Sequence, residues 1–203
     1  YRNWVLVQFE KEYNFNIIGG YTGSGKTLLL HELKKQEKEI IDLEDLANHR
    51  GSAFGALGED PQPKQEMFEN MLGEKLQEAN KKIQAESNSS PPFRGLGGVI
   101  YLEDESQRIT LWNTMRRSPV YFLDIPFTER LDYITNEYGK FEKEKLIEAI
   151  IRIQKRLGGL QTKMAIEQLQ GGHLRECFRI LLTYYDKWYS KGLHNRENLS
   201  SLL

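Results

Sequence analysis

Apolar residues form short unbroken runs that alternate with stretches of helical spacing in the first 127 positions. The runs typical of buried parallel strands occur at residues 15–18, 39–43, 99–102 and 120–123. Between them, apolar side chains recur at helical spacing over residues 64–83 and roughly 106–117. Strands separated by helices predict a mainly parallel sheet with helices on both faces.

After residue 127 the apolar spacing becomes helical. One predicted helix carries Leu146, Ile147, Ile150, Ile153 and Leu157 on one face and ends at Gly158 and Gly159. Two more are predicted, from about Gln161 to Gly171 and from about His173 to Lys191. We therefore expect an α/β core over residues 1–127 and a helical C-terminal subdomain over residues 128–203.

Two parts of the predicted core lack a clear helical or strand pattern. Residues 1–13 mix aromatic and charged side chains and are expected to be a connecting or packing segment. Residues 84–98 have the composition of a loop and are expected to be a flexible connection.

The stretch from residue 20 to residue 27 matches the phosphate-loop pattern G-x-x-x-x-G-K-[ST]. It follows the first predicted strand and precedes a helical pattern, as a P-loop requires. Such a loop points backbone N–H groups at an anion, and the helix N-terminus adds positive charge. Lys26 would contact the outer phosphates and Thr27 would bind Mg²⁺. The expected diphosphate- or nucleotide-binding residues are Gly20, Tyr21, Thr22, Gly23, Ser24, Gly25, Lys26 and Thr27. The predicted fold class is therefore a P-loop NTPase-like α/β fold.

Acidic residues follow the third predicted strand. An acid at the carboxyl end of a strand beside the P-loop can hold Mg²⁺ or its waters. Glu103, Asp104 and Glu105 occupy this position, and strand alternation would turn Asp104 away from the other two. We expect Glu103 and Asp104 to join Thr27 as metal ligands, and Asp104 to join Lys26 in catalysis.

Asp42 and Glu44 follow the second predicted strand in the same way, and a polar segment comes after them. A doubly wound fold places substrate contacts beyond such strand ends. His49, Arg50 and Ser52 lie in this segment and are expected to bind substrate, with Arg50 also assisting catalysis by neutralising phosphate charge. A structural role for His49 is the alternative.

Further arginines lie near the acidic strand end and the helix after it. Arg108, Arg116 and Arg117 are expected to bind substrate because guanidinium groups match phosphate geometry, and Arg130 follows the fourth strand. Surface solubility is the alternative role.

The last predicted helix interleaves aromatic and basic residues. Aromatic side chains can stack on bases and cations can hold phosphates, although aromatics at helical spacing also pack cores. These residues are Tyr184, Tyr185, Trp188 and Tyr189, with Arg175, Arg179, Lys187 and Lys191.

Composition narrows the function classes. The 203 residues carry a formal net charge of −1, which makes no bulk electrostatic case for nucleic acid. One cysteine, Cys177, excludes an internal disulfide framework and a cysteine-built metal site, and its surroundings predict a buried thiol. There is no membrane-length apolar run or secretory signal, so we expect a cytoplasmic location without a membrane partner. Since the first residue is Tyr1, a fragment or processed product is expected.

Several segments together resemble the tRNA 2-selenouridine synthase family. They are residues 19–27, 42–55, 61–63, 65–70 and 102–106. That family joins an N-terminal rhodanese-like domain to a C-terminal P-loop domain, and this chain resembles only the second. The resemblance covers most of residues 1–135 and, more loosely, the helical tail.

The resemblance implies action on 2-thiouridine at the tRNA wobble position. The sulfur is geranylated from geranyl diphosphate, and selenophosphate then gives 2-selenouridine. On this basis we expect the P-loop to hold the diphosphate of geranyl diphosphate, with Mg²⁺ at Thr27 and an acid from residues 103–105. Lys26, Mg²⁺ and an arginine would stabilise the departing diphosphate.

The family resemblance also implies what the chain lacks and what it contacts. The family's essential cysteine belongs to the rhodanese-like domain, and Cys177 does not match it, so this chain alone is not expected to complete selenation. The expected partner is tRNA, with residues 128–203 supplying a binding face.

Two other functions remain open from the sequence. A small-molecule or nucleoside kinase would show similar strands and acids, with Arg116, Arg117 and Arg130 as lid arginines. A nucleotide-gated RNA-binding module would need no transfer chemistry. A regulatory GTPase is not expected, because no Asn-Lys-x-Asp motif is present.

Overall fold

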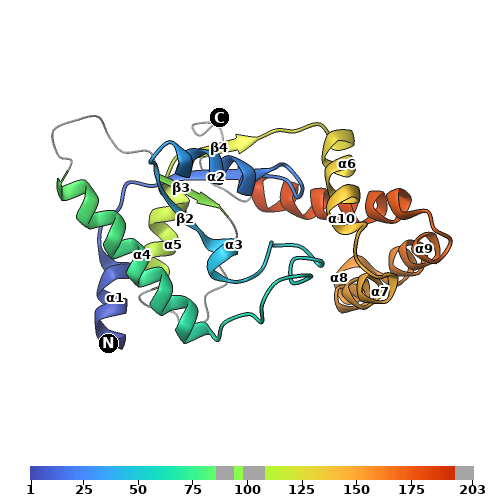
Figure 1. Cartoon of the computed structure of the whole chain (residues 1–203), viewed down its shortest axis with the longest axis horizontal. Helices are drawn as coiled ribbons and strands as arrows, with labels where there is room; N and C mark the ends of the chain where they lie inside the picture. Colours follow the sequence, from blue (N-terminus) through green and yellow to red (C-terminus); the bar gives the residue numbers. More distant parts are fainter. Residues whose placement is uncertain (86–93, 98–107, 195–203) are drawn as a thin grey trace.

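The computed structural model describes residues 1–85, 94–97 and 108–194, which form a parallel sheet with its helices and a separate group of helices (Figure 1). In the described residues the sheet has four strands in the order β2-β3-β1-β4. The strands are β1 (Asn16–Gly20), β2 (Glu39–Asp42), β3 (Arg94–Gly97) and β4 (Val120–Leu123). All pairings are parallel, and Ile17 of β1 lies opposite both Leu96 and Val120. The α/β fold class is confirmed.

The position of β3 corrects one expectation. The sequence predicted a flexible connection over residues 84–98, but residues 94–97 pair with β1 on one side and β2 on the other. Two neighbouring strands satisfy the backbone polar groups of this glycine-rich segment, so its loop-like composition does not decide its conformation. Residues 84–85 end a helix. The strand predicted at 99–102 lies outside the described residues.

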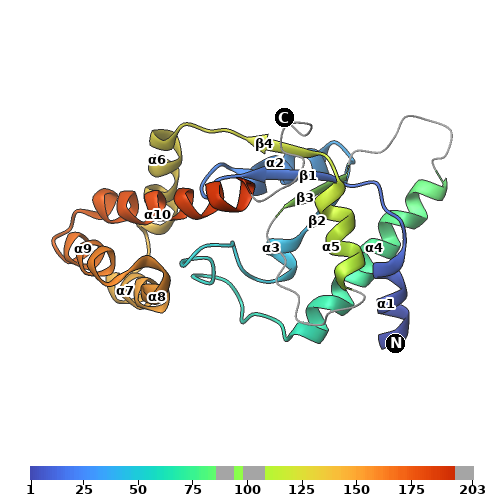
Figure 2. The ribbon, with the colours of Figure 1, turned by 180° about the vertical axis from the view of Figure 1, so that it is seen from behind.

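Helices pack on both faces of the sheet. Ile17 belongs to a core shared with α1 (Arg2–Glu10), α4 (Gln65–Ala85) and α5 (Arg108–Arg117). Ile18, the next residue of β1, points to the opposite face, where α2 (Lys26–Lys35) packs. Because α1 contributes to the core that contains Ile17, the segment before β1 is a helix packed on the sheet. Figures 1 and 2 show α1, α4 and α5 side by side at one end of the molecule.

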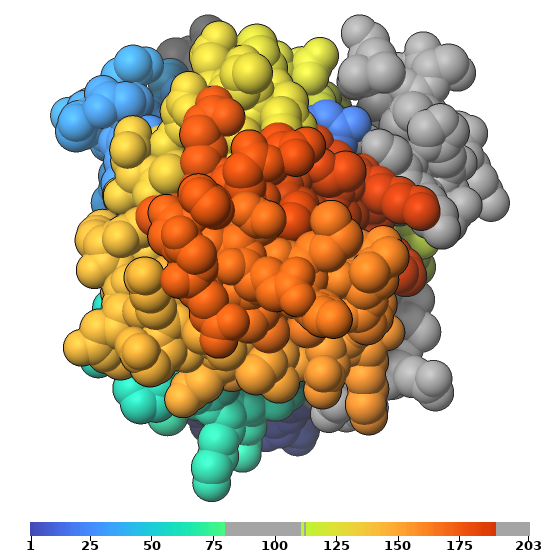
Figure 3. Space-filling view, turned by 90° about the vertical axis from the view of Figure 1, so that its right-hand side faces the viewer, coloured from blue at the N-terminus to red at the C-terminus, as the bar shows by residue number. Residues whose placement is uncertain are grey.

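A second hydrophobic core lies in the group of helices after β4, which we call the helical part. The helical part contains α6 (Phe127–Tyr138), α7 (Lys143–Arg152), α8 (Gln154–Leu157), α9 (Gly159–Gln170) and α10 (Leu174–His194). The single helix predicted before Gly158 is divided into α7 and α8 at Ile153. The last helix runs a few residues past the predicted end. Figure 3 shows these helices forming one end of the molecule.

Residues 47–64, which we call the bridging loop, connect the two cores. The loop leaves α3 (Leu43–Leu46) and reaches across to the helical part before it returns to α4 (Figures 1 and 2). Phe54 is 2% exposed, and its ring packs against Tyr138 of α6 and Phe178 of α10. Burial of one aromatic side chain therefore fixes the far end of the loop. No helix in the described part of the chain has the length and apolar character needed to cross a membrane.

Candidate functional site

The P-loop joins the end of β1 to the first turn of α2. Gly23 and Gly25 have φ angles of 79° and 78°, in the left-handed region that glycine adopts without strain. A Cβ atom at Gly23 would lie 2.8 Å from Cδ1 of Ile134, so α6 packs directly on the loop. The loop therefore has a shape that depends on glycine both for its backbone angles and for its contact with the helical part.

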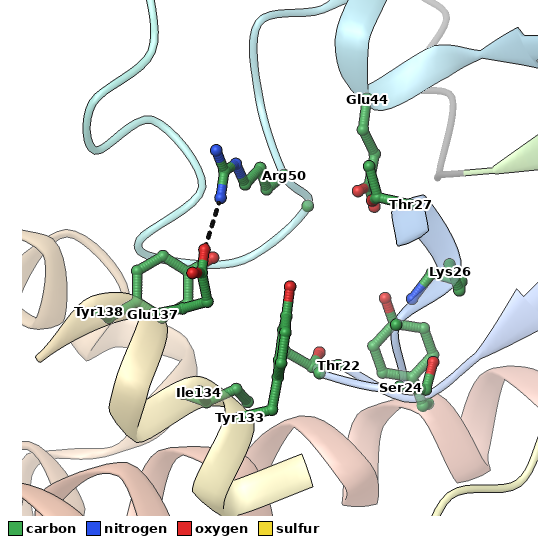
Figure 4. A pocket seen from close by; sticks show the side chains of 14 residues that line it. Thr22, Ser24, Lys26, Thr27, Glu44, Arg50, Tyr133, Ile134, Glu137 and Tyr138 are labelled. Carbon is green, nitrogen blue, oxygen red and sulfur yellow. Dashed lines mark hydrogen bonds and ion pairs between the residues drawn. The ribbon is translucent and has the colours of Figure 1, made fainter. Parts of the chain in front are cut away.

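The loop forms one side of a pocket, which we call the P-loop pocket. Figure 4 shows Lys26, Thr27 and Glu44 on one side, Arg50 and Glu137 on the other, and Tyr133 projecting between them. The pocket lies at the carboxyl end of the sheet, where open α/β folds bind ligands. Its lining residues are Thr22, Gly23, Ser24, Gly25, Lys26, Thr27, Glu44, Arg50, Gly51, Tyr133, Ile134, Glu137, Tyr138 and Tyr189.

Two polar side chains of the loop fit an anion. Lys26 Nζ donates to the carbonyl oxygens of Gly20 at 3.1 Å and Tyr21 at 3.3 Å. Burial lowers the pKa of Lys26, and the negative charge of Glu44 opposes that change. Ser24 Oγ is buried at the pocket without a hydrogen-bond partner among the described residues. An anion would give Ser24 Oγ a partner and would accept the remaining N–H of Lys26.

Glu44 is the acid that the structure brings to the P-loop. Asp42 Oδ1 accepts hydrogen bonds from the backbone N–H groups of Glu44 at 3.0 Å and Asp45 at 3.2 Å, which begins α3 at the end of β2. Burial raises the pKa of Glu44, while the charge of Lys26 and hydrogen bonding by Thr27 oppose the rise. Glu44 and Thr27 thus place a carboxylate and a hydroxyl side by side in the pocket.

The acids expected to bind the metal, Glu103 and Asp104, lie outside the described residues, so their roles stay predictions. Within the described ranges, no group of three or more His, Cys, Asp or Glu side chains could hold a metal ion. A site there would combine Thr27 and Glu44 with phosphate oxygens. The sequence indicated that Glu44 follows a strand, but Glu44 was not among the predicted metal ligands.

Arg50 reaches the pocket from the bridging loop. Its Nε donates to Glu59 at 2.6 Å and its Nη1 donates to Glu137 at 3.0 Å. These two carboxylates hold the guanidinium opposite Lys26 (Figure 4). The other N–H groups of the guanidinium can still donate to a ligand.

His49 and Ser52 do not line this pocket. His49 Nδ1 accepts a hydrogen bond from the backbone N–H of Gly51 at 3.1 Å, and burial lowers the pKa of the imidazole. Ser52 is buried, and its Oγ lies 3.4 Å from the hydroxyl of Tyr138. Both residues line a neighbouring cavity instead.

Two further arginines that were expected to bind substrate lie away from the P-loop pocket. Arg116 and Arg117 are exposed at the last turn of α5, just before β4 begins. This position is at the amino ends of the strands, on the sheet edge away from the P-loop, because a crossover helix returns the chain to that edge. Arg108 begins α5, but the structure does not describe its side chain.

Arg130 has a structural position. Its side chain is buried and pairs with Asp186 of α10 through two hydrogen bonds, at 2.9 and 2.6 Å. It also donates to the backbone carbonyl of Thr22 at 3.2 Å. Arg130 thus links the P-loop to the helical part and is not exposed as a lid arginine would be.

The structure adds pocket residues that the sequence did not mark as parts of this site. Tyr133, Glu137 and Tyr138 come from α6, and Tyr189 comes from the far end of α10. Burial raises the pKa of Tyr189 and Tyr138. No local motif distinguishes these residues, because their shared position arises only when α6 and α10 pack together.

The expected aromatic and basic face of α10 is divided by packing. Arg175 pairs with Asp132, and Arg179 pairs with Glu176. The hydroxyl of Tyr185 accepts a hydrogen bond from the backbone N–H of Ala53 at 2.6 Å, so this side chain is engaged within the protein. The exposed aromatic side chain is Trp188, with Tyr184 half-buried beside it.

Comparison with known proteins finds one family model and several curated relatives that match this chain. A family model described as the tRNA 2-selenouridine synthase AAA domain matches residues 13–201. The tRNA 2-selenouridine synthase of Marinobacter nauticus is 34% identical, over 90% of this chain and 55% of the relative. The one from a Sulfurovum species is 33% identical, over 93% of this chain and 54% of the relative.

The chain spans about half the length of these curated relatives. No solved structure matches it. The family model covers nearly the whole chain, including the P-loop and all five helices of the helical part. The chain therefore belongs to the tRNA 2-selenouridine synthase AAA domain family.

Proposed function

We propose that this chain is the domain of a tRNA-modifying transferase that binds geranyl diphosphate and presents it to the 2-thiouridine of the tRNA wobble position. The observation that carries the proposal is the pocket in which the P-loop, Lys26 and Arg50 converge. The names of the relatives support tRNA modification and selenouridine as the context.

The proposed ligand group is a diphosphate. A P-loop recognises phosphate oxygens through backbone N–H groups, so the same loop serves a nucleotide or a prenyl diphosphate. Lys26 and Arg50 lie on opposite sides of the pocket and would contact the anion from two directions. Ser24 Oγ would donate a further hydrogen bond.

The proposed reaction needs leaving-group stabilisation rather than a nucleophilic side chain. A lone pair on the thiouridine sulfur forms a bond to the first prenyl carbon, and the carbon–oxygen bond breaks with its electron pair leaving on the diphosphate. The ring nitrogen beside the thiocarbonyl gives up its proton to water, so that the alkylated base is neutral. Lys26, Arg50 and the loop amides would stabilise that charge. Cys177 has no part in this step, because its thiol is buried in the helical core and burial raises its pKa to about 12.

Mg²⁺ fits this site through Thr27 and Glu44. Their hydroxyl and carboxylate oxygens are ligands that Mg²⁺ accepts, with phosphate oxygens and water completing its shell. Bound there, the ion would supply positive charge to the diphosphate. Glu103 and Asp104 remain proposed as further acids.

Replacement of sulfur by selenium is proposed for the longer protein. We propose selenophosphate as the co-substrate and an upstream rhodanese-like domain as the other component, since the chain spans only about half of its relatives. This chain alone would not complete selenation.

The kinase alternative loses three residues that could have served as its lid arginines. Arg116 and Arg117 lie at the far edge of the sheet, and Arg130 is buried against Asp186. The nucleotide-gated RNA-binding module differs from the transferase in its ligand, so a ligand comparison separates them.

Titration calorimetry with geranyl diphosphate and Mg²⁺ tests the proposal. We expect saturable binding, weakened at least about tenfold by Lys26→Ala, which corresponds to about 1.4 kcal/mol. Lys34→Ala is the matched control, because Lys34 is exposed at the other end of the same helix. Saturable binding of ATP without binding of geranyl diphosphate would overturn the transferase proposal. RNA affinity that rises with ATP would then favour the RNA-binding module, and ATP-dependent phosphorylation of a small acceptor would favour the kinase.

A further inference from the structure

A second cavity lies next to the P-loop pocket, between the bridging loop and the helical part. Its volume is about 300 Å³, at the lower end of the size range for small-molecule sites. His49, Ser52 and Ala53 line it from the bridging loop, and residues of α7, α8 and α10 line it from the other side. Gly51 lines both this cavity and the P-loop pocket, so the two are neighbours.

The cavity is positively charged on its helical side. Arg152 and Arg156 line it from α7 and α8, and both side chains are exposed. In the described part of the chain, Arg156 has no ion pair or hydrogen bond, and Arg152 has a single 4.0 Å ion pair with Glu148 on its own helix. An exposed pair of this kind contributes little to stability, so both guanidinium groups can bind an anion.

Aromatic rings lie beside these arginines. Tyr184 and Tyr185 line the cavity with their ring centroids 5.4 Å apart. Burial raises the pKa of Tyr184, and the charge of Arg156 opposes the rise, which is consistent with the two side chains lying close together. Trp188 is 52% exposed, and its ring centroid lies 6.2 Å from that of Tyr184. An aromatic surface thus continues from the cavity to the outside.

We propose that this second cavity binds one unstacked nucleotide of a single-stranded RNA segment, with Arg152 and Arg156 on its phosphate and Tyr184 against its base. The inference rests on the proposed tRNA substrate and names where that substrate contacts this chain. Guanidinium groups match phosphate oxygens in pairs, and aromatic side chains stack on bases extruded from RNA loops.

The chemistry of the cavity favours a nucleotide over a prenyl chain. An apolar chain placed there would cover His49 and two guanidinium groups without giving them polar partners, which is unfavourable. The apolar crevice below the P-loop, lined by Ile134, Phe178 and Leu182, holds only about 10 Å³ in this structure. A nucleotide uses both the charges and the rings.

The location matches the proposed reaction. A nucleotide in the second cavity would lie on the other side of Gly51 from a diphosphate on the P-loop. His49 accepts from the Gly51 N–H through Nδ1, which leaves Nε2 as the nitrogen that carries the hydrogen in the neutral ring. That N–H is a donor for a base or ribose oxygen.

Fluorescence anisotropy with a labelled short RNA hairpin that carries a loop uridine tests the inference. We expect Arg156→Gln and Tyr184→Leu each to weaken RNA binding about tenfold. Arg156→Gln should also reduce the slope of log affinity against log salt by about one, and Tyr184→Leu should leave the slope unchanged. Binding of inorganic pyrophosphate to the P-loop should be unaffected by either change.

Arg175→Gln is the matched control, because it removes the same charge from α10 at a residue that pairs with Asp132 outside the cavity. It should retain native RNA affinity, and circular dichroism should show all variants folded. Native RNA affinity in both Arg156→Gln and Tyr184→Leu would overturn the inference. So would weakened binding of geranyl diphosphate with unchanged RNA binding, which would identify the prenyl chain as the occupant.

The outcomes also separate this inference from the proposed function. If the chain binds pyrophosphate and geranyl diphosphate but not the hairpin, the inference fails and the diphosphate site stands. If it binds none of them, the proposed function fails, and the inference that rests on it fails too.

Discussion

The two sides of the P-loop pocket are built in different ways. Apart from Glu44, one side is a single stretch of chain, residues 20–27, whose backbone angles are set locally at its glycines. The other side combines the bridging loop with α6 and α10, which are far apart in the sequence. The first side is set by residue type at each position. The second exists only because Phe54, Arg130 and their partners are buried together.

This difference separates anion binding from substrate positioning. Local sequence sets the backbone angles of the loop that would hold a diphosphate, whereas the helical part supplies the tyrosines, Glu137 and one wall of the second cavity. Changes in the helical core should therefore reduce stability and positioning before they abolish the loop. Three substitutions test this separation.

The largest expected effect is that of Phe54→Ala. Phe54 is 2% exposed between Tyr138 and Phe178, and truncating such a ring costs about 3–5 kcal/mol of unfolding free energy. The bridging loop would also lose its attachment, so Arg50 would no longer be held opposite Lys26. Urea unfolding measures the stability, and calorimetry with pyrophosphate measures the anion affinity.

Leu160→Ala is the control for this truncation, because Leu160 is an exposed apolar residue of the same helical part. It should change the unfolding free energy by less than about 0.5 kcal/mol. If Phe54→Ala behaves like Leu160→Ala, the bridging loop is not held by its aromatic contact, and the second side of the pocket is less dependent on burial than we infer.

Sequence could predict the first side and much less of the second. The glycine, lysine and threonine spacing of the P-loop carries its own geometry, and periodicity located most strands and helices. This approach failed for residues 94–97, because strand pairing with β1 and β2 overrides the composition of that segment. Arg130 looked like a phosphate ligand, but it is buried against Asp186, which lies 56 positions away, and no local pattern reveals this pairing.

The second largest effect is expected for Arg130→Ala. Removing this arginine leaves Asp186 without its buried partner and the Thr22 carbonyl without its donor, at a cost of about 3 kcal/mol. Because Thr22 belongs to the P-loop, pyrophosphate affinity should fall as well. The same unfolding and calorimetric measurements apply.

Arg175→Ala removes an ion pair that is exposed, between Arg175 and Asp132. Its cost should be below about 1 kcal/mol, since solvent screens such pairs. Equal losses for Arg130→Ala and Arg175→Ala would show that burial of the Arg130 pair does not strengthen the link between the two sides.

Glu44→Gln is expected to have the smallest effect on stability, and it should stabilise the protein, whereas the two other substitutions destabilise it. Burial raises the pKa of Glu44 above its ordinary value, so the folded chain binds this proton more tightly than the unfolded chain does. The resulting stability is fully present below the ordinary pKa of about 4.5 and is lost as pH rises through the folded value. Glutamine does not ionise, so the variant does not lose this stability as the pH rises. It should therefore be more stable than the native chain at neutral pH, by about 2–4 °C in Tm.

Asp42 also has its pKa raised by burial, and it remains in the variant. The difference between the native and Glu44→Gln stability curves across pH therefore isolates Glu44, and Glu32→Gln, at an exposed residue of α2, is the control. Parallel curves would mean that Glu44 is not desolvated in the folded pocket. A gain in stability together with a loss of Mg²⁺-dependent diphosphate binding would show that this carboxylate is kept ionised beside Thr27 at a cost to the fold, because the pocket needs its charge.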